Sequence, residues 1–173
     1  MGGDRLFRNS AEGRFEDVTE LAGVGGDVDD WSTCSAFFDA DNDGDLDLFV
    51  GHYVQWSPTI DFEQGTTLTG IGRAYGQPMN FQGTFPTLYQ NQGDGTFKDV
   101  SGECGIQIKN AATEVPVAKS LGVAPVDLNG DGLMDLIVAN DTVQNFVFMN
   151  QGGMVFKEVG ARTGIGFDSF GRA

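Results

Sequence analysis

Hydrophobic and polar residues alternate over two short stretches of the chain. Residues 46–50 read Leu-Asp-Leu-Phe-Val and residues 134–138 read Met-Asp-Leu-Ile-Val, so apolar side chains recur at every second position. A period of two is typical of a β-strand. Each stretch follows an acidic loop, and before each loop a less polar run ends at Asp39 or at Asp127. The pattern predicts two copies of a strand–loop–strand unit, 88 residues apart.

A second pattern occurs three times and predicts a hairpin. Residues 9–18, 91–100 and 150–159 align without gaps, with Asn first, Phe seventh and Val tenth in every copy. Glycines between the Asn and the Phe favour a tight turn. A Gly-aliphatic pair follows each copy at the same offset: Gly23-Val24, Gly105-Ile106 and Gly164-Ile165. Helix signals are weak, and only residues 18–23 predict a short helical turn.

Together these elements form units of four strands, which is the size of a β-propeller blade. We expect an all-β fold, namely a fragment of a β-propeller with four-stranded antiparallel blades and acidic loops between the first two strands of a blade. The expected units are the last two strands of one blade at 4–19, a blade at 32–101 with a long insertion at 54–86, a blade at 119–159, and the first strand of a further blade at 169–173. The sequence is therefore expected to be part of a longer array.

Composition narrows the possible partners. Lys and Arg number 10 and Asp and Glu 25, which gives a net charge of −15 at pH 7. That charge argues against nucleic acid and against an anionic membrane surface, because phosphate binding needs clustered cations. No run approaches the ~20 apolar residues of a membrane-spanning helix. Hydrophobic residues make up 40% of the chain, which is too many for a disordered acidic tail.

The two acidic loops have the spacing of a divalent-cation site. Both follow the pattern Asp-x-Asp/Asn-x-Asp-Gly-x-x-Asp. Ca²⁺ takes six to eight oxygen ligands, and the glycine permits the sharp turn that lets them converge. The predicted ligands are Asp39, Asp41, Asp43, the backbone carbonyl of Asp45 and Asp47 in the first loop, and Asp127, Asn129, Asp131, the backbone carbonyl of Leu133 and Asp135 in the second. We therefore expect two Ca²⁺ sites per chain.

The same loop sequences have two alternative interpretations, an EF-hand and a simple polar turn. An EF-hand needs an acidic residue at position 12 followed by a helix, but position 12 is Val50 or Val138 and strand-like sequence follows. Simple polar turns are the second alternative, since Asp, Asn and Gly favour turns. Five Asp within nine residues repel one another, however, which works against a compact turn without a cation. Mg²⁺ fits less well because it demands octahedral geometry and keeps its waters.

These loops, with Phe170-Gly171 and Val123-Ala124-Pro125 ahead of loop positions, resemble FG-GAP/VCBS repeats. Those repeats are the calcium-loop blades of integrin-alpha-like β-propellers. The insertion, with segments 52–61 and 75–78 leading into 87–100, resembles the ASPIC/UnbV (cartilage acidic protein-like) group. Members often carry cysteines in this insertion, one of them at the position of Gly76, and this chain has none there. The resemblance implies an exported calcium-binding propeller.

Other candidate chemistry is sparse. His52 is the only histidine, so a zinc site or a His-paired nucleophile lacks partners, and a structural histidine is expected. Cys34 and Cys104 are expected to be small buried side chains, with a disulfide between them as an alternative. The aromatic residues of the insertion suit either a protein or glycan contact or a cap on the blade edge. Asp61, Glu63 and Asp94 show no spacing that marks a catalytic pair, and no catalytic residue is predicted.

Two classes of function remain open at this stage. The first is an interaction scaffold, stabilised by Ca²⁺ and secreted, extracellular or periplasmic, that recognises protein or glycan through its loops. The second is a non-catalytic propeller within a larger biosynthetic or hydrolytic enzyme. Expected partners also include the remaining blades, or a second copy of the chain that pairs with open strand edges.

Overall fold

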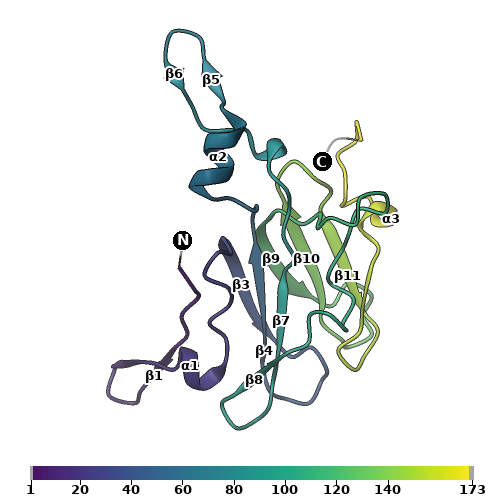
Figure 1. Ribbon diagram of the computed structural model, residues 1–173. Helices are drawn as coiled ribbons and strands as arrows, with labels where there is room; N and C mark the ends of the chain where they lie inside the picture. The colour runs from purple at the N-terminus through teal and green to yellow at the C-terminus, as the bar shows by residue number, and fades with distance from the viewer. Residues whose placement is uncertain (1, 172–173) are drawn as a thin grey trace.

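The computed structural model describes residues 2–171 and contains two four-stranded antiparallel sheets that lie against each other (Figure 1). The first sheet, in the order β3-β4-β7-β8, consists of Ser32–Phe38, Asp47–His52, Thr87–Asn91 and Phe97–Asp99. The second, in the order β9-β10-β11-β12, consists of Ser120–Val126, Asp135–Asn140, Phe146–Asn150 and Phe156–Glu158. Each sheet is a meander of four neighbouring strands, which confirms the predicted all-β architecture of propeller-like blades.

The threefold sequence repeat forms the same hairpin each time. β1 (Phe7–Asn9) and β2 (Phe15–Asp17) pair with Asn9 opposite Phe15. In β7–β8 the corresponding residues are Asn91 and Phe97, and in β11–β12 they are Asn150 and Phe156. The aligned Asn and Phe are thus cross-strand partners at the last ladder position before the turn.

The main core lies between the two sheets. Phe49 and Leu88 from the first sheet and Phe146 and Phe148 from the second are fully buried in one hydrophobic cluster. β4 is buried along its whole length, because its other face packs against the N-terminal segment through Leu48 and other apolar residues. The alternation of apolar and polar residues correctly predicts β4 as a strand. It does not reveal that both faces of the strand are buried.

The repeated Gly-aliphatic pairs connect one unit to the next. The predicted helical turn is confirmed as α1 (Thr19–Ala22), which ends at Gly23 with a φ of 74°. A Cβ added to Gly23 would lie 3.5 Å from the carbonyl oxygen of Phe97 on the following hairpin, and one added to Gly105 would lie 2.3 Å from that of Phe156. In these two copies the glycine lets the chain pass close to the next hairpin, and the Val24 or Ile106 that follows it is buried. The third copy differs, because Ile165 is 38% exposed.

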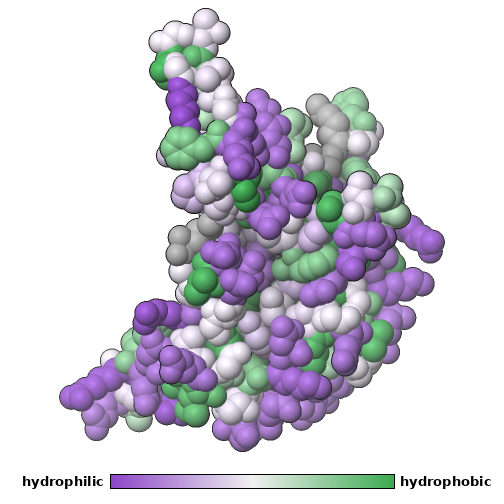
Figure 2. Space-filling view, viewed as in Figure 1, coloured by the Kyte–Doolittle hydropathy of each residue, from purple (hydrophilic) through white to green (hydrophobic). Residues whose placement is uncertain are grey.

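The insertion between β4 and β7 has its own secondary structure, which was not predicted. It contains α2 (Pro58–Gln64), the short strands β5 (Thr67–Leu68) and β6 (Gly72–Arg73), and the 3₁₀ helix η1 (Pro78–Asn80). Ser57 caps α2, since its Oγ accepts the backbone N–H of Ile60 at 3.2 Å, and Pro58 follows at the first helical position. The insertion projects from the sheets and exposes hydrophobic residues (Figures 1 and 2).

One predicted strand is not formed. Residues 169–171 of the expected strand 169–173 form a turn and a bend, and residues 172–173 lie outside the described part of the chain. The backbone N–H of Gly171 donates to the carbonyl of Asp168 at 2.9 Å, and the Asp168 carboxylate accepts the N–H of Phe170 at 2.8 Å. These local bonds replace strand pairing. Among residues 2–171, no helix is long and apolar enough to cross a membrane.

Candidate functional site

Three carboxylates of the first acidic loop converge in the structure. Asp39, Asp41 and Asp43 each place one oxygen within 4.8 Å of the others. The loop is held in shape by its own backbone, because the Asp39 carboxylate accepts the N–H of Asp43 at 3.1 Å and of Gly44 at 3.0 Å. Gly44 has a φ of 97°, as the sharp turn requires. The group could hold a metal ion, because its ligand atoms are hard anionic oxygens close together.

Asp41 has one carboxylate oxygen with a hydrogen-bond partner and one without. Its Oδ2 accepts the side-chain amide of Gln90 at 2.8 Å, whereas its Oδ1 is buried with no hydrogen-bond partner. A buried carboxylate oxygen without a partner is costly. A cation would satisfy it.

Asp47 makes backbone contacts that the spacing did not predict. Its carboxylate is 1% exposed, and it accepts the N–H of Ala40 at 2.8 Å and of Asn91 at 2.9 Å. It is absent from the converging group of three. Burial raises the pKa of Asp47, and the two backbone hydrogen bonds partly offset that rise. Asp47 therefore ties the acidic loop to the hairpin through its backbone contacts. Asp45, whose carbonyl was a predicted ligand, is exposed in the same loop.

The second loop repeats this scaffold closely. Asp127 accepts the N–H of Asp131 at 3.3 Å and of Gly132 at 3.0 Å. These bonds, that from Gly132 most of all, hold the pKa of the Asp127 carboxyl below its usual range. Asp135 is fully buried and accepts the N–H of Leu128 at 3.0 Å and of Asn150 at 2.7 Å. It thus occupies the same position as Asp47.

The second loop differs from the first in its side-chain contacts. Asn129 donates its amide to Asp131 Oδ2 at 2.8 Å, so these two predicted ligands bond to each other. The N–H of Leu133, whose carbonyl was a predicted ligand, donates to Asp131 Oδ1 at 2.8 Å, just as the N–H of Asp45 donates to Asp43 Oδ1 in the first loop. Asn129 stands where the first loop has Asp41, and its amide can donate this internal bond. The predicted ligand set of the second loop therefore carries one negative charge fewer for a cation to neutralise.

Sequence reasoning missed the residues that brace both loops from the hairpins. Asn91 donates its side-chain amide to the carbonyl of Leu46 at 2.9 Å, and Asn150 donates to that of Met134 at 3.1 Å. Asn150 also donates to the carbonyl of Ala40, which follows β3 in the first acidic loop, at 2.8 Å. The signal for this role was the Asn that begins every copy of the hairpin repeat.

Comparison with known families agrees with this repeated geometry. The model of the FG-GAP-like repeat family matches residues 1–50 and 75–138, which is more than half of the chain. The chain belongs to the FG-GAP-like repeat family. Residues 51–74 and 139–173 are not matched. The first of these stretches lies largely in the insertion, where α2 and the β5–β6 hairpin have no counterpart in the other sheet. No curated protein matches the chain.

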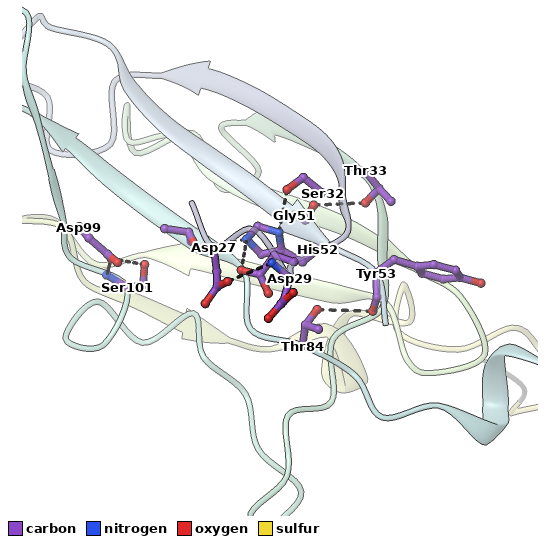
Figure 3. A network of polar contacts seen from close by, with 12 residues as sticks. Asp27, Asp29, Ser32, Thr33, Gly51, His52, Tyr53, Thr84, Asp99 and Ser101 are labelled. Atoms are coloured by element: carbon purple, nitrogen blue, oxygen red, sulfur yellow. Dashed lines mark hydrogen bonds and ion pairs between the residues drawn. The ribbon is translucent and has the colours of Figure 1, made fainter. Parts of the chain in front are cut away.

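In this FG-GAP-like repeat protein His52 is buried in a polar network at the end of β4 (Figure 3). Its Nδ1 lies 3.1 Å from Ser32 Oγ, and its Nε2 lies 3.2 Å from Thr87 Oγ1 and 3.9 Å from a carboxylate oxygen of Asp30. Burial raises the pKa of Asp30, and the nearby His52 opposes that rise. Both ring nitrogens lie within hydrogen-bond distance of hydroxyl groups, as expected for a histidine that stabilises the fold.

The remaining sequence candidates are separated in the FG-GAP-like repeat protein. Cys34 and Cys104 are both free, and burial raises the pKa of each thiol. Asp61 is buried in the insertion, where it pairs with Arg73 at 2.6 Å. Asp94 lies in the β7–β8 turn and accepts the hydroxyl of Thr96 at 2.6 Å. Asp61 and Glu63 thus lie together in α2, whereas Asp94 lies on a different element.

Proposed function

We propose that this protein is a calcium-binding β-propeller module whose ions stabilise the loops between the first two strands of each blade. The observation that carries the proposal is the convergence of Asp39, Asp41 and Asp43 within 4.8 Å, with Asp41 Oδ1 buried and without a partner. Calcium suits the site because it accepts irregular shells of carboxylate and carbonyl oxygens. The second loop has the same backbone scaffold and is proposed as a second, less acidic site.

Calcium binding is expected to raise the stability of the protein. A ligand that binds only the folded state stabilises it in proportion to RT ln(1 + [L]/Kd). At millimolar Ca²⁺ and a Kd of ~10⁻⁴ M, each site adds about 1–1.5 kcal/mol. For a chain of this length the melting temperature then rises by about 2–6 °C per site. The measurement is thermal unfolding in EGTA, Mg²⁺ and Ca²⁺, with calorimetric stoichiometry.

A pair of variants with equal charge change sharpens this test. Asp43→Ala removes a proposed ligand, and Glu12→Ala removes one negative charge from the exposed β1–β2 turn. The stoichiometry is expected to fall from two Ca²⁺ to one for Asp43→Ala and to stay at two for Glu12→Ala. If the wild-type protein neither binds calcium nor shifts its melting temperature, the loops are polar turns and the proposal fails.

The proposed setting is secreted, extracellular or periplasmic, where millimolar calcium would saturate sites of this affinity. We propose a non-catalytic interaction scaffold that recognises protein or glycan and belongs to the ASPIC/UnbV group. Support for this comes from the insertion, which projects from the blade and exposes Phe62, Ile71 and Tyr75. A non-catalytic propeller within a larger biosynthetic or hydrolytic enzyme is the alternative.

The proposed assembly partner is a further blade or a second copy of the chain. The β1–β2 hairpin forms a sheet of only two strands, and Phe7 and Phe15 on it are 50% and 68% exposed. Strand edges of this kind offer unpaired backbone groups to another chain. We expect residues 1–173 alone to self-associate or to be unstable, as light scattering after size exclusion would show. A folded monomer at high concentration would contradict this expectation.

A further inference from the structure

An aromatic pocket lies where the insertion meets the first sheet, away from the acidic loops. It has a volume of about 470 Å³, and six of its lining residues are Trp31, Tyr53, Trp56, Tyr75, Pro78 and Phe81. These residues come from three segments: the loop before β3, the chain after β4, and the part of the insertion around η1. A volume of this size is typical of a small-molecule site.

The rings form an ordered arrangement. Trp31 meets Tyr53 edge-to-face with ring centroids 5.4 Å apart, and it meets Trp56 in the same way at 6.2 Å. Such contacts fix the rings relative to one another. Figure 3 shows the ring of Tyr53 pointing away from the His52 network.

The second sheet braces the pocket wall. The hydroxyl of Tyr53 donates to the carboxylate of Asp141 at 2.5 Å, and burial together with that carboxylate raises the pKa of Tyr53 to about 12. Lys119, which is 5% exposed, donates its ammonium to the carbonyl of Pro78 at 2.8 Å. Two pocket residues are therefore tied to groups near the β9–β10 pair, so the pocket is preformed.

The electrostatic setting of the pocket favours a cation. The eight lining residues carry no charge. Asp30 precedes Trp31 directly, and Asp27 and Asp29 lie just before it in the chain. The positive charge of the buried Lys119, which lies behind Pro78, is offset by the nearby carboxylate of Asp141. With a net charge of −15 on the whole chain, the surrounding field attracts cations to the pocket.

We propose that this pocket binds a quaternary ammonium group. Aromatic faces attract such a cation through their quadrupoles, and a group without N–H or O–H needs no hydrogen-bond partner from the apolar wall. A sugar would leave its hydroxyls unpaired there, at a cost in affinity. An anionic ligand would be repelled by the net negative charge of the chain. This site is independent of the proposed calcium loops.

The protein contains its own probe for this binding. Its two tryptophans, Trp31 and Trp56, both line the pocket, so tryptophan fluorescence reports on this site alone. The experiment titrates choline against 3,3-dimethylbutan-1-ol, its neutral isostere, at constant ionic strength kept with NaCl. We expect choline to bind at least about fivefold more tightly. Equal affinity for both, or no fluorescence change with choline, would overturn the proposal.

Variants at Tyr75 separate ring chemistry from shape. Tyr75 is 80% exposed, so its replacement leaves the fold intact. Tyr75→Leu is expected to weaken choline binding about two- to fivefold, while Tyr75→Phe keeps the ring and the affinity. Phe15→Leu, on the distant β2, is the matched control and is expected to bind like wild type. Equal affinity of the Leu and Phe variants at position 75 would contradict a cation–π contact there.

The source of the group can be distinguished in the same assay. Phosphocholine carries the same cation with an added phosphate, which the acidic surroundings repel. Weaker binding of phosphocholine than of choline points to a free cation. Equal binding points to a headgroup, and both results support recognition of the quaternary ammonium.

Discussion

Replacing Asp135 with alanine is expected to lower the free energy of unfolding by about 3 kcal/mol or more, because two backbone N–H groups lose their acceptor. Asp135 is fully buried and accepts from Leu128 at 3.0 Å and from Asn150 at 2.7 Å. Asp135→Asn is not expected to rescue the loss, since its amide NH₂ would face one of these donors. Urea unfolding of both variants in EGTA measures the effect.

Asp131→Ala is the matched control in the same loop. Asp131 is exposed, and its contacts to Asn129 and Leu133 are local. In EGTA we expect Asp131→Ala to cost less than about 1 kcal/mol. In Ca²⁺ both variants are expected to lose the calcium increment of that loop. If Asp135→Ala unfolds like wild type in EGTA, the contacts of Asp135 to the hairpin contribute little.

Gly105→Ala is expected to destabilise the protein by about 2–4 kcal/mol, from backbone strain and overpacking together. Gly105 has a φ of 86°, and its added Cβ would lie 2.3 Å from the carbonyl oxygen of Phe156. That carbonyl belongs to the β12 backbone and cannot rotate away as a side chain would. Moving it would disturb the bond from the Phe156 N–H to the carbonyl of Cys104 at 2.7 Å. Denaturant unfolding gives the difference.

Gly164→Ala separates the two contributions to that cost. Gly164 holds the same place in the repeat and has a φ of 77°, but an added Cβ there meets nothing within 4 Å. We expect only the left-handed strain, about 1 kcal/mol. Equal losses at Gly105 and Gly164 would mean that the close approach to Phe156 does not matter.

The sequence was sufficient for the parts of the fold that repeat. Alternation located β4 and β10, and the aligned Asn and Phe located the hairpins, because a strand pattern seen twice is hard to produce by chance. The helix α2 was not predicted although Ser57-Pro58 is a helix start signal, because the Gly and Pro residues of the insertion favour an irregular loop.

The candidate site was predictable only in part. Spacing identified Asp39, Asp41 and Asp43, which the structure brings together. The same spacing could not reveal that Asp47 binds backbone N–H groups, because its partner Asn91 is 44 residues away. The aromatic pocket was not predictable either, since Trp31 and Tyr75 meet only through the path of the insertion.

The way the insertion leaves the blade has a consequence for how such proteins can diversify. Val54 and Gly83 form an antiparallel bridge, so the two ends of the inserted segment are adjacent. β4 and β7 on either side remain paired as neighbouring strands. A segment whose ends already meet can change in length at little entropic cost to the rest of the chain. Exchange of this segment between relatives is therefore a route to new ligand specificity on an unchanged blade.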